Sequence, residues 1–334
     1  MRLRKAIPSA PGWRRVRSGH GFRYLDENGH SLPSADVARC RALVIPPAWQ
    51  QVWICPYANG HIQAIGIDAR GRRQYIYHPQ WRVKRDLAKH DRVLKIARRL
   101  PDARRQVEAD LRRDGMPIER ALATAFRLLD LGYFRIGSDT YATENGSYGL
   151  TTLERRHVHR HGKLLLFEFT AKSGISQHIE IIDPLALASV EAMRRRRGSG
   201  EQLLAYRNGS RWVGLTAGEV NEYLKGLLRG EVSAKDFRTW HGTVQAAVAL
   251  AHLDAGTPTA RKRAVAEAMR EVAHHLGNTP TVARASYVDE RVIDRYLDGT
   301  TIASALDRIE KLPLGDVRRT ERTERAVLRL IKTG

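Results

Sequence analysis

The sequence lacks the features that mark membrane, secreted and zinc-binding proteins. Its 334 residues include only two cysteines, Cys40 and Cys55, too few for a disulfide framework or a zinc cluster and typical of a reducing intracellular setting. No run of about 18 apolar residues is present, so no transmembrane helix is expected. The basic residues of Met1–Lys5 precede no apolar segment, so we expect no signal peptide. These absences predict a cytoplasmic protein that is not inserted in a membrane.

Two kinds of cofactor motif are also missing. The chain has no G-x-x-x-x-G-K-[ST] loop to cradle ATP and no Cys/His spacing that suits zinc. A histidine tract, His157–His161, falls on a predicted strand and turn beside arginines, where a solvated basic edge is a better interpretation than a metal site. We therefore expect neither a metal nor a nucleotide cofactor.

Positive charge is abundant. Fifty-seven Lys and Arg against 36 Asp and Glu give a net charge of +21, a field that attracts polyanions. The charge gathers in residues 2–23 and 70–105 and in the run Arg194–Arg197, a clustering that favours an interaction surface. Duplex DNA is the partner that this charge favours, although a GC-rich genome alone also enriches arginine. A membrane surface is a weaker alternative, because residues 82–99 have only a modest apolar stripe.

Periodicity divides the chain into a β-rich part and a helical part. Residues 22–79 are β-rich, with strands predicted over 52–54, 62–67 and 74–77 and a hairpin turn at Gly71. The pattern becomes helical from residue 80, with a helix beginning at Pro101 and another at Pro117 that runs to about residue 131.

A short β segment interrupts the helices. Three strands are expected around Val158, over 164–169 and over 177–182, with turns at Gly162 and Ser173–Gly174. From Pro184 nearly to the end we expect helices over 184–196, 216–228, 234–254, 259–276, 280–296 and 316–331. The predicted fold class is α+β, with a small β-rich N-terminal domain (1–80) and a larger, mainly helical domain (81–334) that contains a three-stranded sheet.

Four short strings contain residues suited to phosphoryl chemistry. They are centred on Arg135 (in FRIGS), Lys172 (in FTAKSG), Arg238 (in KDFRT) and Tyr287 (in ARASY). A single arginine is usually solvated or ion-paired, and a helical tyrosine is usually half-buried packing, so each string is weak alone. Together, in this order, the strings resemble type IB DNA topoisomerases, most closely the compact poxvirus-like bacterial family. The resemblance also includes Tyr141, Glu144–Asn145, Gly149–Leu153, Asn278–Pro280 and, as a DNA-contacting hairpin, Asp68–Tyr75 with Tyr77.

The resemblance implies a mechanism without ATP or metal. Tyr287 would attack a DNA phosphorus and form a 3′-phosphotyrosyl link, and reversal would reseal the strand and relax positive and negative supercoils. Arg135 and Arg238 would hold the non-bridging oxygens, and Lys172 would protonate the leaving 5′ oxygen. In poxviral members a histidine stands nine residues before the tyrosine, where this chain has Asn278. An amide donates a hydrogen bond but shuttles no proton near neutral pH, so a transition-state donor is expected. A helix N-cap before Thr279–Pro280 is the alternative role for Asn278.

The resemblance also implies how DNA is bound. The basic side chains of the hairpin would contact phosphates, its glutamine would reach a base edge in the major groove, and its tyrosines would share one face. The expected DNA-binding residues are Arg70, Arg72, Arg73, Gln74, Tyr75, Tyr77 and Tyr141. We expect a monomer whose two domains form a clamp around duplex DNA, associated with the nucleoid.

Two alternative functions fit part of the sequence. Tyrosine recombinases use a similar set of residues, but they usually have a histidine three residues before the second arginine, where this chain has Lys235. Their N-terminal arm is helical, unlike the β-rich segment expected here. A non-enzymatic basic DNA-binding protein would explain the charge but leaves the ordered strings unexplained.

Overall fold

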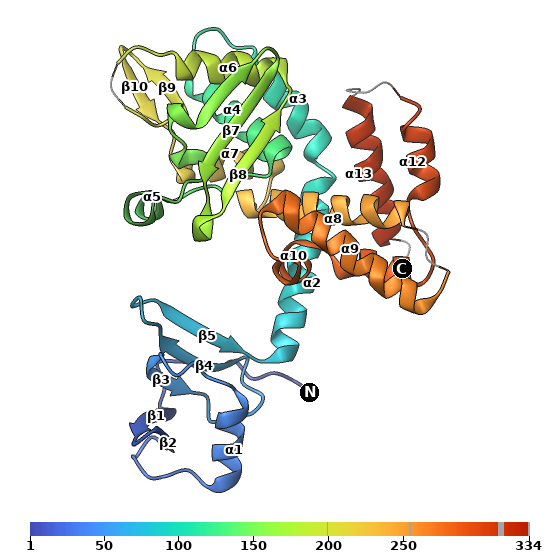
Figure 1. Ribbon diagram of the computed structural model, residues 1–334. Coiled ribbons are helices and arrows are strands. Elements are labelled where there is room, and N and C mark those ends of the chain that lie inside the picture. Colours follow the sequence, from blue (N-terminus) through green and yellow to red (C-terminus); the bar gives the residue numbers. More distant parts are fainter. Residues whose placement is uncertain (199, 254–255, 313–316, 333–334) are drawn as a thin grey trace. The chain divides into compact units, whose positions relative to one another are not determined.

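The computed structural model describes residues 1–198, 200–253, 256–312 and 317–332. The protein is α+β and divides into two compact units, Met1–Lys89 and His90–Gly334 (Figure 1). The division lies within α2 (Pro79–Ala97), whose first half is largely exposed and whose last turns are buried through His90, Val93, Leu94, Ile96 and Ala97. The sequence analysis placed the domain boundary after residue 80, near the start of this helix, because the residue pattern changes there from β-rich to helical.

The N-terminal unit is a five-stranded antiparallel sheet in the order β2-β1-β3-β4-β5. Its elements before α2 are β1 (Trp13–Ser18), β2 (Gly21–Leu25), α1 (Ser34–Ala42), β3 (Gln50–Ile54), β4 (Ile62–Ile67) and β5 (Arg73–Tyr77). The strands predicted over 52–54, 62–67 and 74–77 are confirmed as β3, β4 and β5. One core includes Cys40, Ile54 and Ala64, and a second includes Cys55 and Ile65.

Strand β1 was not predicted because it is rich in arginine. Arg15 within it is buried, and its guanidinium donates to the carbonyl oxygens of Ile45, Pro46 and Trp49 at 2.8, 2.9 and 2.8 Å. Part of the basic character of residues 2–23 is therefore structural.

The larger unit contains two further small sheets among helices. Its elements after α2 are α3 (Leu100–Leu111), α4 (Ile118–Gly132), α5 (Asp139–Asn145), η1 (Leu150–Thr152), η2 (Arg155–His157), β6 (Val158–His161), β7 (Leu164–Thr170), η3 (Lys172–Gly174), β8 (Ser176–Ile181), α6 (Pro184–Arg194), β9 (Ala205–Asn208), β10 (Arg211–Gly214), α7 (Ala217–Leu228), α8 (Ala234–His252), α9 (Pro258–Leu276), α10 (Pro280–Tyr287), α11 (Glu290–Leu297), α12 (Ala303–Ile309) and α13 (Val317–Lys332). The three expected strands are confirmed as the antiparallel sheet β6-β7-β8.

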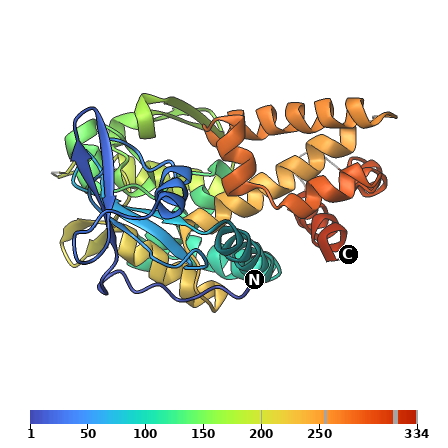
Figure 2. The same cartoon turned by 90° about the horizontal axis from the view of Figure 1, so that it is seen from below.

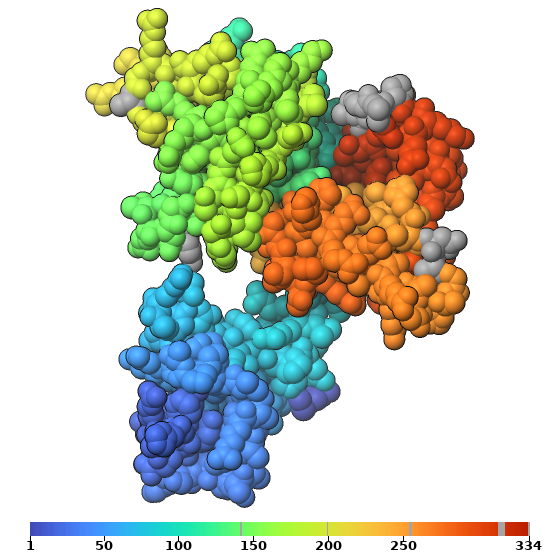
Figure 3. Space-filling model, viewed as in Figure 1, coloured from blue at the N-terminus to red at the C-terminus, as the bar shows by residue number. Residues whose placement is uncertain are grey.

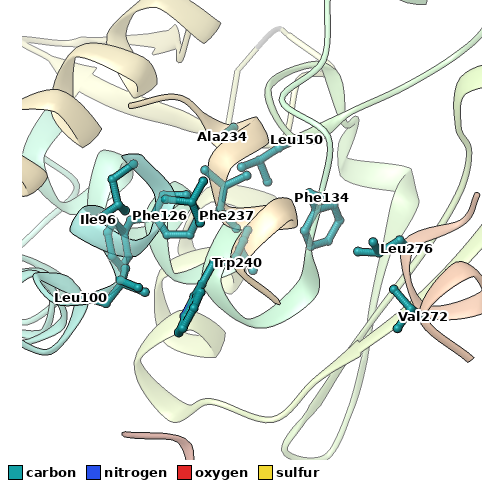
Figure 4. Close-up of a cluster of buried hydrophobic side chains, with 14 of the residues drawn as sticks. Ile96, Leu100, Phe126, Phe134, Leu150, Ala234, Phe237, Trp240, Val272 and Leu276 are labelled. Carbon is teal, nitrogen blue, oxygen red and sulfur yellow. The ribbon is translucent and has the colours of Figure 1, made fainter. Parts of the chain in front are cut away.

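Helices α4 and α8 lie in the core of this unit. The rings of Phe126 on α4 and Phe237 on α8 meet edge to face at 5.2 Å between centroids, and Trp240 on α8 is fully buried (Figure 4). Helices α9, α12 and α13 lie together on one side of the unit, away from the β9–β10 hairpin (Figures 1 and 2). Among the described residues, no helix is long and apolar enough to cross a membrane.

Two expectations about the C-terminal half are wrong. The region after Pro184 is not continuously helical, because residues 205–214 form the β9–β10 hairpin around Asn208–Gly209. The helix expected over 280–296 is broken, because Val288 is extended and Asp289 caps α11 by accepting a hydrogen bond from the Arg291 amide. The break places Tyr287 at the last position of α10.

Candidate active site

Arg238 occupies a buried position on α8 and is held by backbone carbonyls from two directions. Its Nη1 donates to the carbonyl oxygen of Tyr133, and its Nη2 donates to that of Leu276 at 2.5 Å. Its Nε is buried and has no hydrogen-bond partner among the described residues. Burial, followed by the nearby Arg135, lowers the pKa of Arg238 to about 10, so this guanidinium is still cationic at neutral pH.

The carbonyl of Tyr133 points at Arg238 because the chain turns sharply there. Tyr133 ends α4 in the left-handed conformation, with φ 55°, and its ring lies against His241 with centroids 4.7 Å apart. The ring contact stabilises a backbone conformation that a residue other than glycine seldom adopts. The chain then buries Phe134 in the core and brings Arg135 into the site.

Two strings that carried the resemblance pack against each other around Arg135. The amides of Leu150 and Thr151 donate to the carbonyl oxygens of Arg135 and Ile136, each at 2.8 Å. Gly149 leaves no room for a side chain, since an ideal Cβ there would lie 2.5 Å from the Gly137 nitrogen. The segment that begins at Gly149 therefore fixes the backbone on which Arg135 stands.

Asn278 contacts Arg135 directly. Nη2 of Arg135 donates to Asn278 Oδ1 at 2.8 Å and to the Gly277 carbonyl at 3.1 Å. Asn278 Nδ2 donates to the Leu276 carbonyl at 3.2 Å. Its backbone amide donates to the Ala273 carbonyl in the last turn of α9. The helix-cap alternative is wrong, because the N-cap of α10 is Thr279, whose hydroxyl accepts from the Val282 amide.

Tyr287 is half-buried at the end of α10 and packs on α8. An ideal Cβ at Gly242 would lie 3.2 Å from Tyr287 Cβ and 3.0 Å from its carbonyl oxygen, so any other residue there would push the two helices apart by a few tenths of an ångström. The Thr243 hydroxyl accepts from the Asp289 amide at 3.1 Å, and its one proton is shared between the carbonyl oxygens of Thr239 at 2.8 Å and Tyr287 at 3.3 Å. Gly242 and Thr243, which the sequence analysis missed, hold the backbone of the tyrosine in place.

The charges around Tyr287 favour its phenolate. The Arg238 guanidinium lies 5.0 Å from the centroid of the Tyr287 ring. Burial alone raises the pKa of Tyr287, but Arg238, followed by Arg135 and Lys235, outweighs burial and brings the pKa below its ordinary value. Three of the predicted residues, Arg135, Arg238 and Asn278, are thus gathered with Tyr287 at the ends of α4, α9 and α10 and on α8.

Lys172 differs from the other four. It lies in η3 at the turn between β7 and β8, where Ser173 and Gly174 have φ of 67° and 74°. Its side chain is exposed, and no hydrogen bond or ion pair of its ammonium is found in the described part of the chain. The structure does not bring it into contact with the other four predicted residues.

A buried charge network supports the far side of α8. Arg104 on α3 donates to both carboxylate oxygens of Asp130 at 2.8 and 2.9 Å and to those of Glu324 at 2.6 and 2.8 Å. Glu324 on α13 also accepts from Trp240 Nε1 at 3.0 Å, and His241 Nε2 lies 3.2 Å from Asp130. The guanidinium of Arg104 holds the pKa of Asp130 far below its usual range despite burial that raises it. The network joins α13 to the helix that carries Arg238.

The candidate DNA-binding residues in the N-terminal unit lie on the β4–β5 hairpin. Tyr75 and Tyr77 share one face of the edge strand, as predicted, and stack with centroids 5.8 Å apart. Arg73 lies over Tyr75 at 6.0 Å, and Arg85 lies over Tyr77 at 5.9 Å. Two stacked rings of edge strand β5 therefore lie between two cations, Arg73 of the same strand and Arg85 of α2.

Asp68 organises the tip of the same hairpin. Its carboxylate accepts from the backbone amides of Arg70 and Arg72, from the Arg72 guanidinium at 2.9 and 2.8 Å, and from Gln74 Nε2 at 2.8 Å. The side-chain hydrogen bond from Arg72 is the largest of the causes that hold the pKa of Asp68 well below its usual range. Arg70 and Arg73 are exposed, whereas the charge of Arg72 is already paired.

Other sequence candidates lie elsewhere. The backbone of Tyr141 belongs to α5, and its side chain is outside the described residues. The run Arg194–Arg197 is not a uniform basic surface, because Arg196 is buried and donates to four backbone carbonyls while Arg194 and Arg195 pair with Glu191.

The histidine tract is solvated only in part. His159 and His161 are exposed, as expected for a basic edge, but His157 is buried and accepts from the Glu154 amide at 3.0 Å. In the described segments no group of three or more His, Cys, Asp or Glu side chains is arranged to hold a metal ion.

Comparison with known proteins places this chain in a family. Residues 78–311 match the family described as eukaryotic DNA topoisomerase I, catalytic core, and residues 21–68 match bacterial DNA topoisomerase IB, N-terminal domain. DNA topoisomerase 1B of Acanthamoeba polyphaga mimivirus is 26% identical over 292 residues, which cover 84% of this chain and 86% of that protein. DNA topoisomerase 1B of vaccinia virus (strain Western Reserve) is 20% identical over 251 residues, covering 75% and 76%. DNA topoisomerase 1 of Schizosaccharomyces pombe is 27% identical over 160 residues, covering 47% and 19%. Because the first match alone spans well over half of the sequence, this chain belongs to the type IB DNA topoisomerase family.

Proposed function

We propose that this protein relaxes positively and negatively supercoiled DNA by transient cleavage of one strand through Tyr287. The observation that carries the proposal is the convergence of two cationic guanidinium groups on one tyrosine. Arg238 lies 5.0 Å from the Tyr287 ring, and the pKa of Tyr287 is below its ordinary value because these cations outweigh the effect of burial. A phenol whose ionised form is favoured, beside fixed cations, is suited to attack a phosphodiester.

The proposed cleavage step exchanges one phosphorus–oxygen bond for another. The Tyr287 oxygen forms a bond to phosphorus as its proton is lost to solvent, and the bond from phosphorus to the 5′ oxygen breaks. Lys172 supplies the proton that converts this oxygen to a 5′-hydroxyl. Resealing is the reverse attack by the 5′-hydroxyl, and the energy of the phosphodiester is retained in the tyrosyl link. The cycle therefore requires no ATP and no metal.

Arg135, Arg238 and Asn278 are proposed to bind the phosphoryl oxygens. Arg238 is fixed by two carbonyls, and its buried Nε has no partner among the described residues, so a phosphate oxygen would satisfy a donor that is costly to bury alone. Arg135 is oriented by Asn278 Oδ1 at 2.8 Å. Cations and donors that are already in place stabilise the charge that spreads over the phosphoryl group in the transition state.

DNA binding is proposed to involve both units. In the N-terminal unit Arg70 and Arg73 would contact phosphates, and Tyr75 and Tyr77 would face the DNA together. Gln74 lies on the opposite face of β5 and donates to Asp68, so it would reach a base edge in the major groove only if that hydrogen bond were exchanged. The two units would close around the duplex as a clamp, with the protein acting as a monomer on the DNA of the nucleoid. We propose Tyr141 on α5 as a further contact.

The direct test is relaxation of plasmid DNA. Negatively and positively supercoiled plasmids are incubated with the protein in the presence of a chelator and without ATP. We expect relaxation of both. A strict requirement for magnesium or ATP, or relaxation of only one sign of supercoil, would contradict the proposal.

A further inference from the structure

The inward face of strand β8 contains one polar residue near the active site. Ile181, Ile179 and Gln177 pair with Leu165, Phe167 and Phe169 of β7, all three of which are buried. Since side chains alternate along a strand, Gln177 shares the packed face with the two isoleucines. The only hydrogen bond of its carboxamide to a described residue is a long one of 3.4 Å to the Ser176 carbonyl.

The inward side chains of β8 lie against two glycines that end helices. An ideal Cβ at Gly132, the last residue of α4, would lie 3.0 Å from Ile179 Cγ2. An ideal Cβ at Gly277, which ends α9 with φ 57°, would lie 2.4 Å from Gln177 Nε2 and 2.9 Å from its Oε1. Gln177 therefore packs directly over the Gly277 backbone.

Each of these glycines precedes a segment that holds an arginine of the site. Gly132 is followed by Tyr133, whose carbonyl accepts from Arg238. The carbonyl of Gly277, together with Asn278, accepts from Arg135. The strand thus rests on the two turns that build the phosphate-binding side of the site.

The same hairpin carries Lys172. Gln177 pairs with Phe169 and Ser176 pairs with Thr170, and the Ala171 amide donates to the Ile175 carbonyl at 2.8 Å, which closes the stem just before the turn. In Figures 1 and 3 the β7–β8 end of the unit, in yellow-green, adjoins the orange segment around α10. A displacement of the stem at Gln177 would be transmitted to Lys172, because only the short turn separates them.

We propose that Gln177 is a positioning residue for Lys172. Its carboxamide packs on Gly277 and so holds the stem of the hairpin, and with it the Lys172 turn, against the segment whose Gly277 carbonyl and Asn278 accept from Arg135. This inference rests on the proposed function. The contact between Gln177 and Gly277 is a packing contact and depends on the length of the side chain. A side chain of the same length therefore preserves it, and a truncated one does not.

The chemistry of the leaving group separates this role from a general packing role. A 5′ oxygen needs a proton from Lys172 as it departs, whereas a 5′ sulfur departs as a stable thiolate, since a thiol is far more acidic than an alcohol. A defect that acts through Lys172 is therefore confined to the oxygen substrate. A defect that acts through Arg135, Asn278 or Tyr287 affects both substrates.

The experiment measures single-turnover cleavage on a duplex with a site that the wild-type protein cleaves, made with either a bridging 5′ oxygen or a bridging 5′ sulfur. Gln177→Ala should slow cleavage of the oxygen substrate on the order of 10–100-fold, the scale of a misplaced catalytic group. It should cleave the sulfur substrate at the wild-type rate, as Lys172→Ala should. Gln177→Met, which keeps the length, should restore cleavage of the oxygen substrate.

The matched control is His178→Ala, on the same strand, because His178 is exposed on the opposite face and pairs with Glu168 at 3.0 Å. It should cleave both substrates at the wild-type rate. Unchanged cleavage of the oxygen substrate by Gln177→Ala would overturn the inference, as would equal slowing on both substrates or a Gln177→Met variant as slow as alanine. Failure of the wild-type protein to form any covalent adduct would instead overturn the proposed function.

Discussion

Asn278 offers the sharpest test of the active site, because this chain departs there from the histidine of poxviral members. Its Oδ1 accepts from Arg135 at 2.8 Å, and its amide nitrogen donates to the Leu276 carbonyl with one N–H remaining. Truncation to alanine removes the orienting acceptor and the proposed donor to phosphate, while Arg135 keeps the Gly277 carbonyl at 3.1 Å. Loss of one preorganised donor typically costs ~10²–10³ in rate, about 2.7–4 kcal/mol, so Asn278→Ala should slow cleavage by that order.

The aspartate and histidine variants separate the possible roles. Asn278→Asp should be slower than alanine, because a carboxylate would pair with Arg135, repel the phosphate and donate nothing. Asn278→His should retain much of the activity, since a neutral imidazole accepts at one nitrogen and donates at the other. Single-turnover cleavage rates are measured beside DNA affinity and melting temperature, which should change little because Thr279 caps α10. An aspartate variant as fast as wild type would refute the reasoning.

Three further predictions follow from particular contacts. Arg73→Gln should reduce the slope of log DNA affinity against log salt by about 0.9, the value of one phosphate contact. Arg72→Gln should reduce the slope less, because Asp68 already pairs with Arg72. Equal slopes for both variants and the wild-type protein would place the phosphate contacts elsewhere. Gly242→Ala should slow cleavage more than it weakens DNA binding, because its Cβ would press on Tyr287, and wild-type cleavage by this variant would show that the helices tolerate the methyl group. Glu324→Ala should lower the free energy of unfolding by roughly 3–5 kcal/mol, because it leaves Arg104 half-paired and Trp240 Nε1 unsatisfied; a calorimetric change well under this would show that the network relaxes.

Much of the fold was readable from sequence because strong local signals mark it. Proline at the first turn predicted the starts of α6, α9 and α10, at Pro184, Pro258 and Pro280, to within a residue. The β9–β10 hairpin was missed although Asn208–Gly209 is a hairpin signal, because the strands on either side are only four residues long and carry charged side chains. The break after Tyr287 was missed because apolar periodicity continues through Val288, and only Asp289 signals a new cap.

The site was readable in part. The ordered strings identified Arg135, Arg238 and Asn278, which the structure gathers with Tyr287. They also identified Lys172, which the structure does not bring into contact with the others. The residues that hold them in place were not visible, because their contribution is made through the backbone. Three such contributions are the Tyr133 carbonyl that binds Arg238, the absence of a side chain at Gly242, and the packing of Gln177 on Gly277. All three depend on contacts between segments far apart in the chain. No local pattern encodes such contacts.

Covalent trapping tests the central claim most directly. Duplex DNA labelled at one end is incubated with the protein, the reaction is stopped with detergent, and protein attached to DNA is resolved by size. We predict an adduct at the 3′ side of the break for the wild-type protein and none for Tyr287→Phe, which should still bind duplex DNA because only the hydroxyl is removed. Tyr296 is a poor substitute nucleophile, since it is buried and its hydroxyl donates to the Leu253 carbonyl at 2.8 Å. An adduct formed by Tyr287→Phe, or attachment of the wild-type protein to a 5′ end, would contradict the account.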